Sequence, residues 1–153
     1  MNTLYYAGRD VKRNYFMLPN ELFDLKLHYI EVVIYAYLLR IENRKTYECV
    51  VSYTTMAEKL GLAVNTVAKY VAKLEEHGLI TTEHTSVTRK DGMKRNGCLK
   101  YHIMPIRHAI DLFHERQLSG VKLAAERQRA YDKAEKNGVE FYPAEEGGEK
   151  RGA

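Results

Sequence analysis

The sequence predicts an α+β domain that is mainly helical and carries a small antiparallel β-sheet. Apolar residues recur at steps of three and four in several segments, which indicates helices with one buried face. Two segments of alternating polarity flank the run "RKDGMKRNG" (residues 89–97), whose Asp-Gly and Asn-Gly pairs are typical of hairpin turns. A length of 153 residues with 45% hydrophobic residues suits one compact domain with extensions.

The segment from about His28 to Asn43 is expected to form the first long helix. Its apolar residues recur at helical spacing and should form one buried stripe: Ile30, Val33, Ile34, Tyr37, Leu38 and Ile41. Ahead of it, residues 15–18 form a short β-prone run, and Pro19 suits the start of a helical turn through Leu22 and Phe23. We expect residues 1–27 to pack as an N-terminal flap.

A short strand and a short helix should follow. The run "ECVVS" favours a strand around residues 48–51 because it is rich in β-branched residues. Ser52 can cap a helix whose apolar face comprises Tyr53, Met56, Ala57 and Leu60. Gly61 should end this helix, since glycine tolerates the left-handed conformation of a C-cap.

The next helix begins after Leu62 and Ala63 and is expected to reach about His77, where Gly78 closes it. Val67, Val71 and Leu74 lie at steps of four and three and should form its buried face. The opposite face would combine hydrogen-bonding and cationic side chains: Asn65, Thr66, Lys69, Tyr70 and Lys73.

Beyond this helix the sequence predicts a basic hairpin, "LITTEHTSVT" paired with "CLKYHIMP". Its loop and edges contain the densest positive charge of the chain, opposed by Asp91 alone: Arg89, Lys90, Lys94, Arg95 and Lys100. These observations give a core domain over residues 28–104.

The C-terminal part divides into a helical extension over residues 105–136 and a tail over residues 137–153. Pro105 suits a first helical turn, and Ile106, Ala109, Ile110 and Phe113 would share one side of that helix. A second, highly charged helical stretch is expected beyond Gly120, reaching about Lys136. The tail has the Gly, Glu and Pro content of a disordered segment.

The predicted order of helix, strand, helix, tight turn, helix and basic hairpin is that of a winged helix-turn-helix domain. Residues 54–80, "TTMAEKLGLAVNTVAKYVAKLEEHGLI", resemble these modules of bacterial regulators and of plasmid or phage replication initiators. The residues that match the pattern in order are Leu60, Gly61, Asn65, Thr66, Val67, Leu74, Glu75, Gly78, Leu79 and Ile80. Over residues 14–117 the chain resembles small helix-turn-helix proteins of Gram-positive mobile elements.

One departure from the family pattern affects DNA reading. The recognition helix of such regulators often begins Ser-Arg, whereas this chain has Ala63 and Val64 there. A capping hydrogen bond worth about 1 kcal/mol is therefore lost, together with a strong reader of guanine. Val64 retains a methyl surface that suits contact with thymine.

The resemblance implies a DNA-binding surface made of the recognition helix and the basic hairpin. Its candidate residues are Val64, Asn65, Thr66, Lys69, Tyr70, Lys73, Arg89, Lys90, Lys94 and Arg95. Simpler readings stay open: the helix lysines could be solvated surface charges, the loop could serve solubility, and Tyr70 could be a packing residue. The partners expected are double-stranded DNA and, through residues 105–136, a second copy of the chain. A winged helix that recruits an acidic protein partner in a replication complex is the main rival.

Other classes of function find little support in the sequence. It has no Gly-rich phosphate loop, nucleophile elbow or paired carboxylates, so we predict a non-enzymatic binder without a cofactor. Cys49 and Cys98 are too few for a zinc motif, and we expect them to pack as reduced, small apolar side chains. We expect no metal, because a site formed by Cys98, His102 and His84 lacks proper ligand spacing. No run of about 18 apolar residues appears, so we expect a cytoplasmic protein with no membrane partner.

Overall fold

The computed structural model describes residues 15–88 and 90–138, except for the side chains of residues 94–96. By its internal contacts the chain divides into two compact units, Met1–His114 and Glu115–Ala153. The elements in chain order are the 3-10 helix η2 (Asn20–Leu25), α1 (Tyr29–Ile41), β1 (Glu48–Val51), α2 (Tyr53–Leu60), α3 (Val64–Glu76), β2 (Ile80–Thr88), β3 (Lys94–Ile103) and α4 (Ile106–Lys136).

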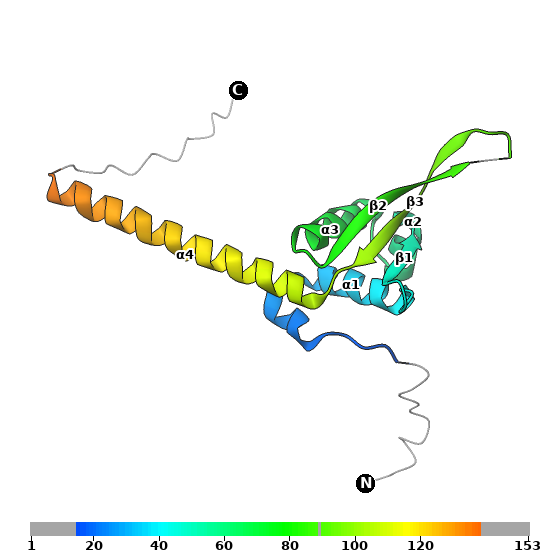
Figure 1. Cartoon of the computed structure of the whole chain (residues 1–153), viewed down its shortest axis with the longest axis horizontal. Coiled ribbons are helices and arrows are strands. Elements are labelled where there is room, and N and C mark those ends of the chain that lie inside the picture. Colours follow the sequence, from blue (N-terminus) through cyan, green and yellow to red (C-terminus); the bar gives the residue numbers. More distant parts are fainter. Residues whose placement is uncertain (1–14, 89, 139–153) are drawn as a thin grey trace, which may run out of the picture. The chain divides into compact units, whose positions relative to one another are not determined.

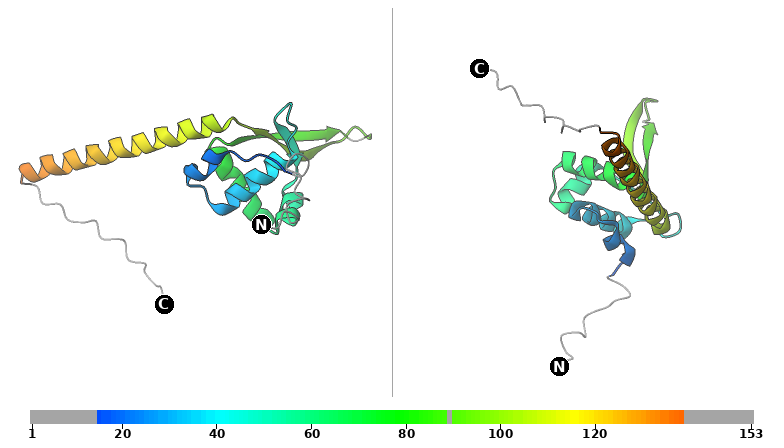
Figure 2. Two further views of the ribbon diagram at one scale, coloured as in Figure 1. Left: turned by 90° about the horizontal axis from the view of Figure 1, so that it is seen from below. Right: turned by 90° about the vertical axis from the view of Figure 1, so that its left-hand side faces the viewer.

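The first unit has a layer of helices on an antiparallel sheet, which confirms the predicted fold class. Within the described residues the strand order is β1-β3-β2, and both pairings are antiparallel. Figure 1 shows the order of the elements, and the left view of Figure 2 shows α1, α2 and α3 on one side of the sheet. The buried core lies between these layers, where Tyr101 of β3 and Ile80 of β2 are fully buried.

The buried face of α1 is rotated from the predicted stripe. Ile30, Ile34 and Leu38 are buried as expected, but so are Glu31 and Tyr35, while Val33 and Ile41 are 43% and 37% exposed. The buried residues form two adjacent rows, each with steps of four, which together face the sheet and α3. The buried face is therefore wider than one stripe and includes the carboxylate of Glu31. The prediction for Val33 and Ile41 was therefore wrong.

The N-terminal residues pack on the core through a helical turn. Leu22 and Leu25 of η2 are buried, and η2 begins after Pro19 as predicted. Residues 15–18 form no strand, although the run is β-prone, and Phe23 is 68% exposed. In the described part of the flap, residues 15–27, two leucines are thus buried in the core and no strand forms.

The hairpin has its turn at one of the two predicted places. Asp91 and Gly92 lie in the turn, where Asp91 Oδ1 accepts a hydrogen bond from the Met93 amide at 3.1 Å. The Asn-Gly pair instead belongs to β3, opposite a β-bulge between His84 and Ser86. A Cβ at Gly97 would overlap the Thr85 hydroxyl, so this glycine allows the close approach of the bulged strand. The Asn-Gly turn was therefore predicted wrongly.

The C-terminal extension contains one helix where two were expected. α4 runs without a break from Ile106 to Lys136, and Gly120 lies inside it. Its first turns belong to the first unit, where Ala109 is buried and Ile106, Ile110 and Phe113 are half-buried, as predicted. From Glu115 onward almost every described residue of α4 is exposed. Gly120 therefore lies in an exposed part of the helix, where packing against other elements does not impose a break.

The corner between α3 and β2 depends on Gly78. This residue has φ +74°, and a Cβ there would lie 2.5 Å from Leu112 Cδ1 and 3.1 Å from His108 Cδ2, so these two side chains would have to shift. The first turns of α4 thus pack directly on the glycine. Gly61, at the end of α2, has a similar φ of +67°, but a Cβ on this residue would meet no atom within 4 Å.

Replacement of these two glycines by alanine separates backbone strain from packing. Gly61→Ala should lower the free energy of unfolding by about 1 to 2 kcal/mol, the cost of a left-handed alanine. Gly78→Ala adds a steric clash with α4 and should cost about 2 to 5 kcal/mol. Urea unfolding of the two variants measures the difference, and equal losses would show that α4 does not hold the corner.

Candidate nucleic-acid interface

The α2 and α3 helices form a helix-turn-helix pair joined by a short turn over residues 61–63. Ser52 Oγ caps α2 by accepting a hydrogen bond from the Thr55 amide at 3.1 Å. Gly61 ends α2 in the left-handed conformation, and the Leu62 amide donates to the Ala57 carbonyl at 2.9 Å. These bonds satisfy backbone groups at both helix ends and fix the direction of the turn, as the sequence predicted.

The α3 helix begins without a side-chain cap. Ala63 occupies the N-cap position and makes no side-chain hydrogen bond, as expected from its chemistry. Free backbone amides at a helix N-terminus, together with the positive end of the helix dipole, favour an anion such as a DNA phosphate. The first turn of α3 is therefore open to hydrogen bonding from outside the chain.

The two faces of α3 differ as predicted. Val67, Val71 and Leu74 are at most 1% exposed and form the buried face. On the other side Asn65 and Lys69 are exposed, and Thr66 and Lys73 are half-buried. The structure thus brings four of the candidate residues of this helix together on one surface: Asn65, Thr66, Lys69 and Lys73. Val64 is 42% exposed because it lies in the first turn, seven residues before Val71 and on the same side of the helix.

Tyr70 does not belong to this exposed surface. Its side chain is 9% exposed, and its ring stacks on His28 with the ring centroids 4.8 Å apart. The Tyr70 hydroxyl also lies 3.4 Å from His28 Nε2. Placing Tyr70 on the exposed face was wrong, because Tyr70 sits at the edge of the stripe that packs against the start of α1.

The ring of Tyr70 also orders its neighbours. Lys69 Nζ lies 5.6 Å and Lys73 Nζ 5.2 Å from the ring centroid, within the range of a cation–π interaction. Two ammonium groups are thereby held beside one anchored aromatic ring. This arrangement concentrates positive charge along the middle of α3.

His28 joins the start of α1 to α3 and was not among the residues singled out from the sequence. Its Nδ1 accepts a hydrogen bond from the Ile30 amide at 3.2 Å. The proton of the neutral ring therefore lies on Nε2, which can donate to the Tyr70 hydroxyl. Glu31 completes the cap, since its Oε2 accepts from the His28 amide at 2.7 Å. The spacing His-x-x-Glu at a helix start is a capping-box signal that could have revealed this role.

The C-terminal end of α3 is tied to α1 and to the sheet. Glu31 Oε1 lies 3.4 Å from His77 Nε2, and Glu31 is a buried carboxylate. Glu75 Oε1 accepts hydrogen bonds from the Thr82 amide at 3.0 Å and the Thr82 hydroxyl at 3.1 Å. These contacts hold α3 at a fixed angle to the first residues of β2.

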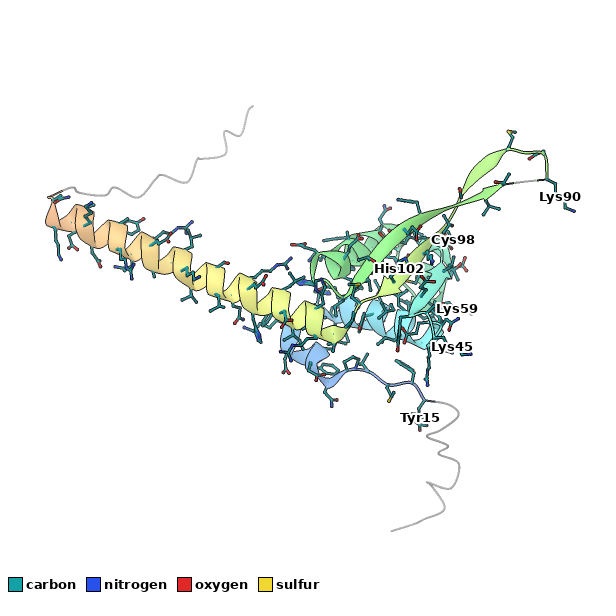
Figure 3. All side chains as sticks on the ribbon, in the orientation of Figure 1. Tyr15, Lys45, Lys59, Lys90, Cys98 and His102 are labelled. Atoms are coloured by element: carbon teal, nitrogen blue, oxygen red, sulfur yellow. The ribbon has the colours of Figure 1, made fainter. Side chains whose placement is uncertain are left out.

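The β2–β3 hairpin extends beyond the helices and has Lys90 at its tip (Figure 3). The backbone pairs Thr88 with Lys94 and Val87 with Arg95 across the hairpin. The side chains of Lys94 and Arg95 and the whole of Arg89 lie outside the described residues. The four candidate residues of the hairpin, Arg89, Lys90, Lys94 and Arg95, are therefore placed at its end only by their positions in the sequence.

Comparison with known proteins supports this architecture. Residues 27–80 match the family model of a helix-turn-helix domain. With the hairpin that follows α3, the chain has the fold of a winged helix-turn-helix domain. The helix α3 occupies the place of the recognition helix in such domains, and the β2–β3 hairpin occupies the place of the wing.

One similar solved structure is a possible transcriptional regulator from Methanosarcina mazei Go1. It is 17% identical in sequence with a TM-score of 0.45, and the similarity covers 74% of this chain and 97% of that one. No curated protein matches the chain. Among the described helices, none has the length and apolar character needed to cross a membrane.

The winged helix domain carries a mixed charge pattern on the outer face of its sheet. Glu48 Oε1 lies 2.9 Å from Lys100 Nζ and 3.1 Å from His102 Nδ1, while His102 Nε2 lies 3.3 Å from Glu83 Oε2. Lys100 was counted with the basic loop, but its charge is balanced by Glu48. Lys100 therefore adds no unbalanced positive charge to the hairpin.

The two cysteines of the winged helix domain are free thiols in different surroundings. Cys49 is buried in the core, and burial, assisted by the nearby Glu42 carboxylate, raises its pKa to about 11. Cys98 is exposed, although it was expected to pack. In the described part of the chain no three His, Cys, Asp or Glu side chains are grouped to hold a metal ion.

The contribution of His28 to anchoring the recognition helix can be separated from its capping role. His28→Asn keeps a good N-cap residue but removes the stacked ring, so it should lower the free energy of unfolding by about 0.5 to 1.5 kcal/mol. His28→Ala also removes the cap and should cost about 1 kcal/mol more. Chemical denaturation measures both, and an Asn variant as stable as wild type would mean that the stack does not anchor α3.

Proposed function

We propose that the protein binds double-stranded DNA, with the N-terminal half of α3 in the major groove. The observation that carries this proposal is the division of α3 into a buried apolar face and an exposed face with hydrogen-bonding and cationic groups. The match of residues 27–80 to a helix-turn-helix model supports DNA binding as the activity. An α-helix of this kind fits the width of the major groove.

Each residue on the exposed face has a role that follows from its chemistry. The amide of Asn65 can make the bidentate contact that selects adenine, and Val64 offers methyl groups to thymine. Thr66, Lys69 and Lys73 suit base edges or the adjoining phosphates. Tyr70, being buried, would act indirectly by holding the two lysine side chains beside its ring.

The wing would contact the flanking backbone or minor groove through Arg89, Lys90, Lys94 and Arg95. Cations at a hairpin tip can neutralise phosphates without reading sequence, since every phosphate carries the same charge. The wing would therefore add affinity, while α3 supplies preference for sequence.

DNA occupancy by a non-enzymatic binder of this size suits control of transcription, and we propose transcriptional regulation as the role. An alternative role is action at a replication or transfer origin of a mobile element. The resemblance of residues 14–117 to helix-turn-helix proteins of mobile elements favours this alternative. The rival proposal is an adaptor whose basic face recruits an acidic protein partner. A shift of duplex DNA in a gel at micromolar protein distinguishes the binder from the adaptor.

Substitutions on the exposed face of α3 test the reading of sequence. Asn65→Ala and Lys69→Ala should leave folding intact, because neither side chain belongs to the buried face. Each lost base contact should cost about 1 to 3 kcal/mol on the preferred duplex and little on random DNA. The preferred duplex is obtained by selecting bound fragments from a random pool, and fluorescence anisotropy then measures both affinities.

Two further variants control this experiment. Lys45→Ala removes the same charge as Lys69→Ala, but from the exposed turn before β1, at the opposite end of α1 from His28. It should leave the preference for the selected duplex over random DNA unchanged. Val71→Ala should cost about 0.5 to 3 kcal/mol of stability with the specificity of the folded protein retained. If Asn65→Ala and Lys69→Ala bind every duplex as wild type does but lose a protein partner in a pull-down, the adaptor replaces the DNA reader.

The contribution of the wing is tested through salt dependence. Changing Arg89, Lys90, Lys94 and Arg95 together to Ala should weaken binding to all duplex sequences about equally. Each lost phosphate contact should reduce the slope of log affinity against log salt by about 0.9. A matched variant with four exposed cations outside α3, the wing and α4 changed to Ala controls for net charge: Lys26, Arg40, Arg44 and Lys45. An unchanged slope in the wing variant, or an equal reduction in the control, would contradict the assignment.

We also propose that residues 105–136 join two copies of the chain. Leu118 and Val121 of α4 are neighbours on one face of the helix and are 60% and 67% exposed, an apolar area that a partner helix could cover. A homodimer would bind two half-sites about one helical turn, roughly 10 base pairs, apart. Sedimentation that shows only monomer at tens of micromolar, with and without DNA, would exclude this.

A further inference from the structure

A pocket of about 460 Å³ lies within the first unit, where the second half of α1 meets the residues that join β3 to α4. Leu39 of α1, Met104 and Ile106 are among its apolar lining residues, and Tyr35, Glu42 and Tyr47 supply its polar groups. A smaller hollow of about 300 Å³ shares Leu39, Glu42 and Tyr47 with it. The volume lies in the range of sites for small organic molecules.

Glu42 is the charged residue among those that line the larger pocket. Its Oε2 atom is buried and has no hydrogen-bond donor within the described residues. Burial raises the pKa of Glu42, although the nearby Arg44 opposes this shift. Glu42 is half-buried, but this one oxygen has lost water without gaining a donor, and a cationic group beside it would restore the missing interaction.

Two tyrosines complete the chemistry of the pocket. Tyr35 is buried, and its burial together with the Glu42 carboxylate raises its pKa to about 12, so the phenol stays neutral at physiological pH. Tyr47 is 59% exposed and lies at the rim shared by the two hollows. Neutral aromatic faces beside a carboxylate attract organic cations, since the ring quadrupole and the negative charge act together.

Arg44 is the cation of this chain that could compete for the same carboxylate. It lines the smaller hollow and is absent from the lining of the larger one. Within the larger pocket the other lining residues are therefore apolar or aromatic, and none of them is a cation. This surface complements a flat apolar body better than a hydrated inorganic ion.

We propose that this pocket binds a small organic cation, with an amine or amidine group against Glu42 and a flat apolar body against Leu39, Met104 and Ile106. The site is separate from the exposed face of α3 and the wing. It would connect the N-terminal flap, the end of α1 and the start of α4 through one ligand. The proposal does not depend on DNA binding and is tested in the absence of DNA.

A matched pair of probes tests the requirement for positive charge. Tryptamine carries an ammonium group on an indole, and tryptophol carries a neutral hydroxyl at the same place. Tryptamine should bind wild-type protein at least about tenfold more tightly, a difference of about 1.4 kcal/mol. In titrations of isotope-labelled full-length protein, the largest changes in amide resonances should fall at Leu39, Glu42, Met104 and Ile106. Equal affinities, changes centred elsewhere, or no binding of either probe at about 10 mM would overturn the proposal.

Two variants locate the charge that the probe recognises. Glu42→Gln keeps the shape of the side chain and should abolish the preference for tryptamine over tryptophol. Glu48→Gln removes a carboxylate that is paired with Lys100 and His102 outside the pocket, and it should keep the preference. A preference that survives in Glu42→Gln, or that is lost in Glu48→Gln, would contradict the assignment. If Glu42→Gln does not fold, the two probes on wild-type protein decide the question alone.

Discussion

The burial of one side of α3 against α1 and the sheet is the interaction on which the proposed function depends. Val67, Val71 and Leu74 supply the apolar contact, and the stacked pair of His28 and Tyr70 extends it to the first turn of α1. Because these residues fix the rotation of α3 about its own axis, they also decide which side chains face outward. Asn65 and Lys69 are exposed as a consequence of this packing.

The residues that hold α3 lie in its middle and at its C-terminal end, while its first turn carries no side-chain cap. Glu31 and Glu75 connect the latter half of the helix to α1 and β2, and Gly78 lets α4 pack on the corner that follows. This distribution leaves the N-terminal end of α3 as the part that can approach another molecule. A groove of DNA, lined with acceptors and phosphates, provides partners for both its free amides and its lysines.

Local signals in the sequence predicted most of the fold. Ser52 and Gly61 marked the ends of α2, and the steps of Val67, Val71 and Leu74 identified the buried face of α3, because caps and helical periodicity act within a few residues. The exposure of Tyr70 and Val33 was predicted wrongly, because it depends on which neighbouring element packs against each residue. The periodicity of the sequence does not reveal those neighbours. The Asn-Gly pair lies in β3, opposite a bulge at Thr85, because the hairpin turns at Asp91 and Gly92 instead. Gly120 lies inside α4, in a part of the helix that is almost wholly exposed. The roles of His28 and Glu42 arise from contacts with residues distant in sequence, so local patterns could at most hint at them.

The most direct test of the central claim is a map of the DNA contact on the folded protein. Isotope-labelled full-length protein would be titrated with a selected duplex while the backbone amide resonances are followed. The account predicts that the largest changes fall at residues 64–69 of α3 and around the tip of the wing near Lys90, with residues of the buried face changing little. Changes centred on the outer face of the sheet, at Glu48, Lys100 and His102, with α3 unaffected, would contradict it.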